Sequence, residues 1–194
     1  MTPQSLIGNM KRHLLNTIAR NKSMSFSLYQ CSIPKFISGL NNLANILTKG
    51  AEHTSERDID ESIFINFRLH PNMLPLSFQV QAATDFVKRG AARMAAIDFP
   101  SYEDNETSFA DLQTRVEKTM IFLASVPEEN IEKHKNDDIV FQAGPYDFKF
   151  NGLDYVNSWV MPNLYFHITT AYNILRHNGV DLGKLDYLGA IAEE

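Results

Sequence analysis

Apolar residues recur every three or four positions over several long stretches of the chain, a pattern typical of helices with one buried face. The clearest stretch is 33–49, where apolar side chains follow the spacing i, i+3, i+4 and i+7. Ser32 is a suitable N-cap for this stretch, and Lys49-Gly50 is a suitable end. The pattern therefore predicts one amphipathic helix over residues 33–49.

The same spacing predicts a second long helix over residues 76–96. Its apolar stripe faces the core, and Gln81, Asp85 and Lys88 point away from that stripe. Gln79 differs from these three, because the helical period places it about 40° from the centre of the stripe. We therefore expect Gln79 to point inward.

Two more long helices are predicted further along the chain. Ser108 and Asp111 form a capping-box pattern, which begins a helix that ends near Val126. The last long helix spans residues 153–178 and contains Pro162, at which we expect a kink. Shorter helices are expected over residues 58–67 and 128–135.

Between the last two long helices the apolar period changes from helical to alternating. Two alternating runs flank Gly144-Pro145, which predicts a β-hairpin with its turn at that dipeptide. The alternation of its second strand places Tyr146, Phe148 and Phe150 toward the helices, and Asp147 and Lys149 toward water. The whole pattern predicts an all-α fold, an up-and-down four-helix bundle with a small β-hairpin insertion.

Composition narrows the class of protein. The chain has 194 residues, which favours one domain, and its single cysteine, Cys31, excludes a disulfide within the chain. No run of eighteen apolar residues is present, so we expect no membrane span and a cytoplasmic protein.

Charge is distributed unevenly along the chain, whose formal net charge is −5. The first acidic residue is Glu52, so residues 52–194 hold all 23 acids with only twelve bases, a net charge of −11. An acidic body argues against nucleic-acid binding, which depends on clustered lysine and arginine. A small-molecule ligand remains compatible with it.

Residues 1–23 contain no acid and form a basic amphipathic stretch. We divide the chain into this N-terminal extension and a bundle domain over residues 24–194. The extension has three interpretations. It is a loosely packed addition, a segment that lies on an anionic membrane surface, or, if the source is eukaryotic, a mitochondrial presequence.

Three polar residues fall on the apolar faces of the predicted helices, namely Gln79, Asn163 and His167. Asn163 and His167 are spaced i, i+4, so they lie on one face of the last helix, and Gln79 could join them from a facing helix. Buried polar side chains cluster because an unpartnered one costs roughly 1–3 kcal/mol. The cluster is either a structural hydrogen-bond network or the floor of a ligand or metal pocket. His70 precedes Pro71 at the start of the second long helix, where it could contribute to the rim of such a pocket.

Two blocks of the sequence resemble domain-of-unknown-function family 1993. One is the run from Pro162 to Gly179, PNLYFHITTAYNILRHNG, and the other is RLHPNMLPL over residues 68–76, followed by Gln79 and Gln81. The resemblance extends over roughly residues 26–189. That family is placed in the DinB/YfiT-like superfamily of metalloenzymes, which implies a four-helix bundle.

The resemblance also implies a location for a metal site. Characterised members of that superfamily bind a divalent metal through three histidines, two of them spaced i, i+4 on the last helix. Aligning the shared Leu-Arg-x-x-Gly end puts Asn163 and His167 at those two positions. The third histidine position falls at Gln79 or Gln81, and the apolar stripe of the helix predicted over residues 76–96 favours Gln79. This chain therefore keeps at most one of the three histidines.

Two functions follow from this comparison. The first is a non-catalytic or ligand-binding helical bundle, expected as a homodimer, whose metal site is degenerate and which needs no cofactor. The alternative is a divalent-metal-dependent enzyme, for example a thiol transferase, that holds zinc or nickel with His167, Asn163, Gln79 and His70.

Overall fold

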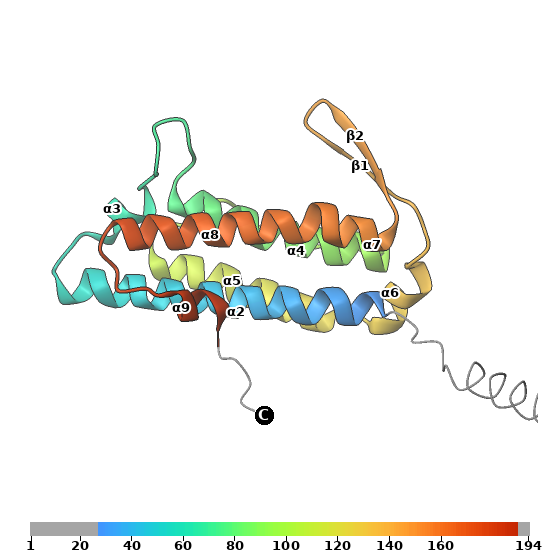
Figure 1. Cartoon of the computed structure of the whole chain (residues 1–194), viewed down its shortest axis with the longest axis horizontal. Helices are drawn as coiled ribbons and strands as arrows, with labels where there is room; N and C mark the ends of the chain where they lie inside the picture. The colour runs from blue at the N-terminus through green and yellow to red at the C-terminus, as the bar shows by residue number, and fades with distance from the viewer. Residues whose placement is uncertain (1–26, 190–194) are drawn as a thin grey trace, which may run out of the picture.

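A computed structural model describes residues 27–189, which form mostly helices and one two-stranded sheet (Figure 1). The four long helices are α2 (Leu28–Glu56), α4 (Leu76–Ala95), α5 (Phe109–Ser125) and α8 (Met161–His177). The shorter helices are α3 (Glu61–Ile65), α6 (Glu128–His134), α7 (Gly152–Tyr155) and α9 (Lys184–Leu188), and a π-helical segment, η1 (Val156–Val160), precedes α8. The helical class and the small hairpin predicted from the sequence are confirmed. The structure also contains short helices in addition to the four long ones.

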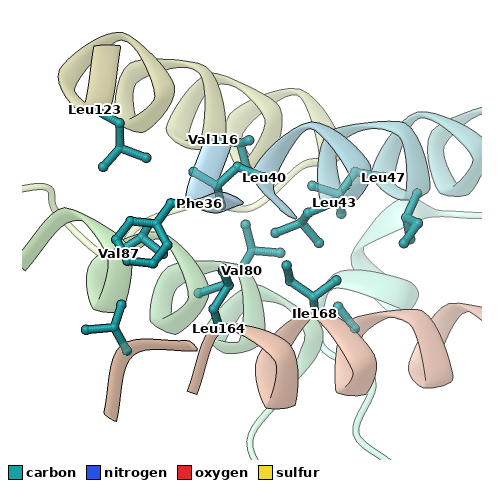
Figure 2. Close-up of a cluster of buried hydrophobic side chains, with 14 of the residues drawn as sticks. Phe36, Leu40, Leu43, Leu47, Val80, Val87, Val116, Leu123, Leu164 and Ile168 are labelled. Carbon is teal, nitrogen blue, oxygen red and sulfur yellow. The ribbon is translucent and has the colours of Figure 1, made fainter. Parts of the chain in front are cut away.

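The core lies between two pairs of long helices. Helix α4 packs most extensively against α8, and α2 packs most extensively against α5 (Figure 1). Buried side chains from all four helices meet between the pairs, among them Phe36, Leu40, Val80, Val116 and Leu164 (Figure 2). Full burial of each such side chain contributes about 1.5–3 kcal/mol, so this interior is the main source of stability.

Helix α2 is longer than the predicted 33–49, and it begins earlier. Its N-cap is Ser27, whose side chain accepts a hydrogen bond from the backbone N–H of Gln30. The prediction of Ser32 as N-cap is wrong, because Ser32 is buried inside the helix and donates to the carbonyl of Leu28. Pro34 therefore lies in the second turn of the helix, where its side chain is exposed.

Gly50 does not end α2, which continues to Glu56. A Cβ atom at Gly50 would lie 2.8 Å from the ring of Phe109, so the glycine lets α2 and α5 approach closely. The prediction of a helix end at Lys49-Gly50 is wrong for this reason, since the small residue serves packing between helices and not termination.

The hairpin consists of β1 (Ile139–Ala143) and β2 (Tyr146–Phe150), joined at Gly144-Pro145 as predicted. Phe148 and Phe150 pack against Trp159, at ring centroid distances of 4.5 and 6.2 Å, and Asp147 and Lys149 are exposed. Tyr146 lies on the same face of β2, 6.5 Å from Phe148 between ring centroids, but it is 67% exposed, so the prediction that it packs toward the helices is wrong. It lies next to the turn, where the hairpin projects away from the helices (Figure 1).

The predicted last helix is divided into three parts, α7, η1 and α8. Within η1 the backbone N–H of Met161 bonds to the carbonyl of Val156, five residues earlier. Pro162, at which the sequence predicts a kink, directly follows this wide turn. The irregularity near Pro162 thus takes the form of a π-helical segment.

Some predictions concern features that the structure does not describe. The extension over residues 1–23 lies outside the described residues. The homodimer and the cytoplasmic location stay predictions. Over the part of the chain that the structure describes, no helix combines the length and the apolar character required to cross a membrane.

Candidate functional site

The centre of the candidate site is a hydrogen bond between His167 of α8 and Gln79 of α4. Nδ1 of His167 lies 2.9 Å from Oε1 of Gln79. Both residues are buried, with exposed fractions of 9% for His167 and 3% for Gln79. The structure thus brings together two of the four residues singled out in the sequence, across the face where α4 and α8 pack.

The partners of Gln79 determine which nitrogen of His167 carries a proton. Nε2 of Gln79 donates to the carbonyl of Leu74 at 2.9 Å, which leaves Oε1 facing the imidazole. Because Oε1 can only accept, Nδ1 of His167 must donate, and Nε2 of His167 keeps a free lone pair. Every buried side-chain nitrogen or oxygen of the described residues has a partner, and no partner of this Nε2 is found among them. Nε2 therefore reaches solvent.

Aromatic side chains surround the imidazole of His167. Phe86 stacks on it at 5.6 Å between ring centroids, and Phe78 and Phe166 present edges at 6.2 and 5.2 Å. Removal of the ring from water disfavours its charged form, and burial lowers the pKa of His167 to about 4. The imidazole is therefore neutral at physiological pH.

Asn163 and His70 do not join this pair. The side chain of Asn163 is half-buried and donates to the carbonyl of Trp159 at 2.7 Å, one turn back along the chain. His70 is exposed in the loop before α4, and its Nδ1 bonds to Oδ1 of Asn72 at 2.6 Å. Asn163 thus braces the helix start beside Pro162, and His70 is engaged within its own loop.

A cavity of about 340 Å³ lies beside the pair, beneath the hairpin. Phe86 separates it from His167, since the same ring stacks on the imidazole and lines the cavity. Other side chains that line it are Arg89, Arg93, Phe141, Tyr155 and Trp159. Its size falls in the range of small-molecule sites.

A second buried polar group, a charged one, lies between α4 and α5. Arg115 is 3% exposed and forms ion pairs with Asp85, Asp104 and Glu106 at 3.1, 2.9 and 2.8 Å. Lys88, only 1% exposed, pairs with Asp85 at 2.8 Å. The prediction that Lys88 points away from the core is wrong, because α4 is covered on this face by α5 and the loop that precedes it.

In this second group, which we call the Arg115 cluster, both buried cations are paired with carboxylates. Burial acts to raise the pKa of Glu106, but hydrogen bonds from Arg115 and Gln81 outweigh it, so the pKa of that carboxyl lies below its ordinary value. Burial lowers the pKa of Lys88, and Asp85 opposes this change. A larger cavity, of about 580 Å³, adjoins the cluster, but the arginine in its wall is already surrounded by three carboxylates.

Comparison with known proteins identifies the family of the chain and agrees with its helical fold. A sequence model described as a domain of unknown function, DUF1993, matches residues 28–188. The chain belongs to the DUF1993 family. Among solved structures it resembles the crystal structure of a DinB family member protein from Shewanella denitrificans, at 34% identity and a TM-score of 0.79. The match covers 86% of this chain and 94% of that one, consistent with a DinB-like superfamily. A search of curated proteins finds no match.

The donors of this DUF1993 chain do not fit the metal site implied by its superfamily. The three positions that the resemblance implies, Gln79, Asn163 and His167, hold one imidazole and two carboxamides, and neutral amide oxygens bind zinc or nickel far more weakly than imidazole does. The amide of Gln79 is moreover bonded to Nδ1 of His167 and to Leu74. Among residues 27–189, no group of three or more histidine, cysteine, aspartate or glutamate side chains is arranged to hold a metal ion.

Proposed function

We propose that this DUF1993 chain is a non-catalytic, ligand-binding protein, built as a DinB-like up-and-down four-helix bundle with a degenerate metal site. The observation that carries the proposal is the hydrogen bond from Nδ1 of His167 to Oε1 of Gln79. At the position where the superfamily places a third imidazole, this chain has an amide that orients the remaining histidine. A residue that fixes the ring does not share a metal with it.

The ligand-binding part of the proposal is supported by the cavity beneath the hairpin. That cavity adjoins Phe86, the ring that covers one face of His167. A ligand bound there would contact Phe86 and would therefore lie next to the position that the resemblance implies for the metal site. The chain would then keep a binding site in this region although it no longer binds the metal.

A second candidate function has one observation in its favour. Nε2 of His167 carries a free lone pair and reaches solvent, the state in which an imidazole binds a metal. A divalent-metal-dependent enzyme, for example one for thiol transfer, would use this nitrogen, with Asn163, Gln79 and His70 as the further ligands. Such an enzyme would require His70 to leave Asn72 and the amide of Gln79 to turn away from His167.

Restoration of the missing imidazoles tests the proposal. We compare thermal melts, with and without zinc, of the native chain, of Gln79→His plus Asn163→His, and of Gln81→His plus Asn163→His. Gln81 is the matched control, because its side chain bonds to Glu106 in the Arg115 cluster. We expect zinc to stabilise only the Gln79→His pair, by about 2.7 kcal/mol at a hundredfold excess over Kd.

Metal content of the native chain, purified without a histidine tag, completes the test. Stoichiometric zinc or nickel, together with a zinc-dependent rise in the melting temperature, would overturn the proposal in favour of the enzyme. A response of the Gln81 control equal to that of the Gln79 pair would show that the position of the third imidazole is wrong.

We also propose that residues 24–194 form the folding unit. The described helices and hairpin lie within this range, as does the match to the DUF1993 family over residues 28–188. A chain that starts at Met24 should keep the helical circular dichroism and the melting temperature of the full chain. A decrease of many degrees would show that residues 1–23 contribute to the fold.

A further inference from the structure

The cavity beneath the hairpin contains an arginine without an acidic partner. The guanidinium of Arg93 lies 4.0 Å from the centre of the Phe141 ring and donates to the hydroxyl of Tyr155 at 2.9 Å. Among the described residues, no carboxylate lies within ion-pair distance of it. Because no buried side-chain nitrogen of those residues lacks a partner, the remaining N–H groups of Arg93 are accessible. A guanidinium in this state can receive an anion.

The one carboxylate in the cavity wall is already neutralised. Oδ1 of Asp85 accepts from Lys88 and Arg115 at 2.8 and 3.1 Å, and its Oδ2 accepts from Arg89 at 2.7 Å. Its negative charge is therefore directed toward the Arg115 cluster and toward Arg89. The charge left over in the wall is that of Arg93, which makes the cavity positive within an otherwise acidic body.

The rest of the wall is aromatic. Trp159 lies edge-on to Phe86 and to Phe141, at 6.1 and 5.3 Å between centroids. Gly90 permits this arrangement, because a Cβ atom there would lie 2.9 Å from Val160 and would push η1 away from α4. Flat faces around one cation suit a flat ligand that carries a negative charge, since rings stack on rings and a guanidinium matches a carboxylate.

We propose that this cavity binds a small aromatic carboxylate, with the carboxylate on Arg93 and the ring among Phe86, Phe141 and Trp159. The inference rests on the proposed ligand-binding function and specifies the class of ligand. The hairpin has a role in it, since Phe141 supplies both a wall of the cavity and the surface on which Arg93 lies.

Trp159 provides the measurement, because it is the chain's one tryptophan and it lines the cavity. We titrate the full chain with benzoate, with benzamide as the neutral isostere, with acetate as the anion that lacks a ring, and with benzylamine as the cation. Selectively excited tryptophan emission should change saturably with benzoate. Benzamide, acetate and benzylamine should each bind at least tenfold more weakly.

Variants locate the bound anion. Arg93→Met should weaken benzoate binding at least tenfold, whereas Tyr155→Phe, which keeps the guanidinium, should retain it. Arg176→Met is the matched control, an exposed arginine outside the cavity wall. The comparison of benzoate with benzamide needs no variant, so the proposal is decided even if Arg93→Met fails to fold.

Two results would overturn the inference, and they differ in what they leave standing. Equal binding of benzamide or benzylamine, or full benzoate binding by a folded Arg93→Met chain, would reject the anionic ligand and keep a ligand-binding protein. No saturable response to any probe would reject this cavity as the site. The degenerate metal site is decided separately, by the zinc melts and the metal content.

Discussion

Helix α4 contributes to two buried polar groups that differ in charge. Toward α8 it presents Gln79, which forms a neutral pair with His167. Toward α5 it presents Asp85 and Lys88, which join Arg115 in a cluster of at least five charged side chains. The neutral pair needs only three hydrogen-bonding groups, including the carbonyl of Leu74, whereas the cluster needs several elements of the chain to balance it.

The neutral pair and the charged cluster require different things from the fold. A buried neutral side chain is satisfied by one or two hydrogen bonds, and its loss costs a modest amount. A buried guanidinium is tolerated only when carboxylates surround it, and removal of one partner leaves charges unpaired in a poorly polarisable interior. The cluster therefore fixes how α4, α5 and the loop over residues 97–108 pack together. The neutral pair imposes a weaker constraint, so its residues can be replaced at a lower cost in stability.

The largest effect is expected from Arg115→Ala. This change leaves the Glu106 side chain, which is 7% exposed, without its ion-pair partner and removes one of the three partners of the half-buried Asp85, so we expect the free energy of unfolding to decrease by about 3–5 kcal/mol. Arg89→Ala is the control, because Arg89 pairs with the same Asp85 but is exposed, and it should cost about 0.2–1 kcal/mol. Denaturant unfolding measures both, and similar losses would remove the distinction between a buried and an exposed partner of Asp85.

The pH dependence of stability separates the two groups. His167 has a pKa of about 4 in the folded chain against an ordinary 6.5, so between these values the unfolded chain binds more protons. Stability should therefore decrease as pH falls from 6.5 to 4, by about 3 kcal/mol in total. His167→Gln should abolish this part of the dependence.

Glu106 acts in a lower range of pH. Its pKa lies below the ordinary 4.5, so its contribution is complete above that value and is lost as pH falls through the lowered pKa. Glu106→Gln should reduce the loss of stability below pH 4.5, to which Asp60, Asp111, Glu132 and Asp186 also contribute through their lowered pKa values, and leave the slope due to His167 intact. If either variant changed the slope in the other's range, the two groups would be coupled through α4.

The smallest effect is expected from Asn163→Ala. The side chain makes one half-buried hydrogen bond, to the carbonyl of Trp159, so the change should cost about 1 kcal/mol. It should leave the titration of His167, followed by NMR, unchanged, since neither residue bonds to the other in the structure. A change in the pKa of His167 would show that Asn163 is coupled to the neutral pair and belongs to the site.

Periodicity predicted that Gln79 and His167 point inward, although it grouped Asn163 with them, and it did not predict the charged cluster. Gln79 and His167 stand on apolar stripes, so a polar residue there is visible in the sequence as an exception. Lys88 and Arg115 stand beside the stripes, where a charged residue is ordinarily exposed. They are buried because α4 is covered on more than one face, a property of the tertiary arrangement that a single helical period does not contain.

The helix boundaries show the same limit. The capping box at Ser108 and Asp111 is local chemistry, and it is confirmed by hydrogen bonds in both directions. The end predicted at Gly50 is wrong because this small residue makes room for the ring of Phe109, which lies far away in the sequence. The cavity beneath the hairpin and the place of Arg93 in its wall were also not predicted from the sequence, since Arg93 and Phe141 belong to different elements.

The π-helical segment η1 has a consequence for insertions and deletions. A turn closed between residues five apart contains one residue more than an α-helical turn. Deletion of one residue within 156–160 would let the helix continue as a regular α-helix. Because the wide turn accommodates that residue within about one turn of helix, the segments on either side would keep nearly the same orientation about the axis. Deletion of one residue from the regular part of α8 between Trp159 and His167 would instead turn the two segments by about 100° relative to one another. Trp159 faces the hairpin and His167 faces α4, so only the second deletion would separate the cavity wall from the neutral pair. A homologue that lacks the extra residue of η1 should therefore keep both.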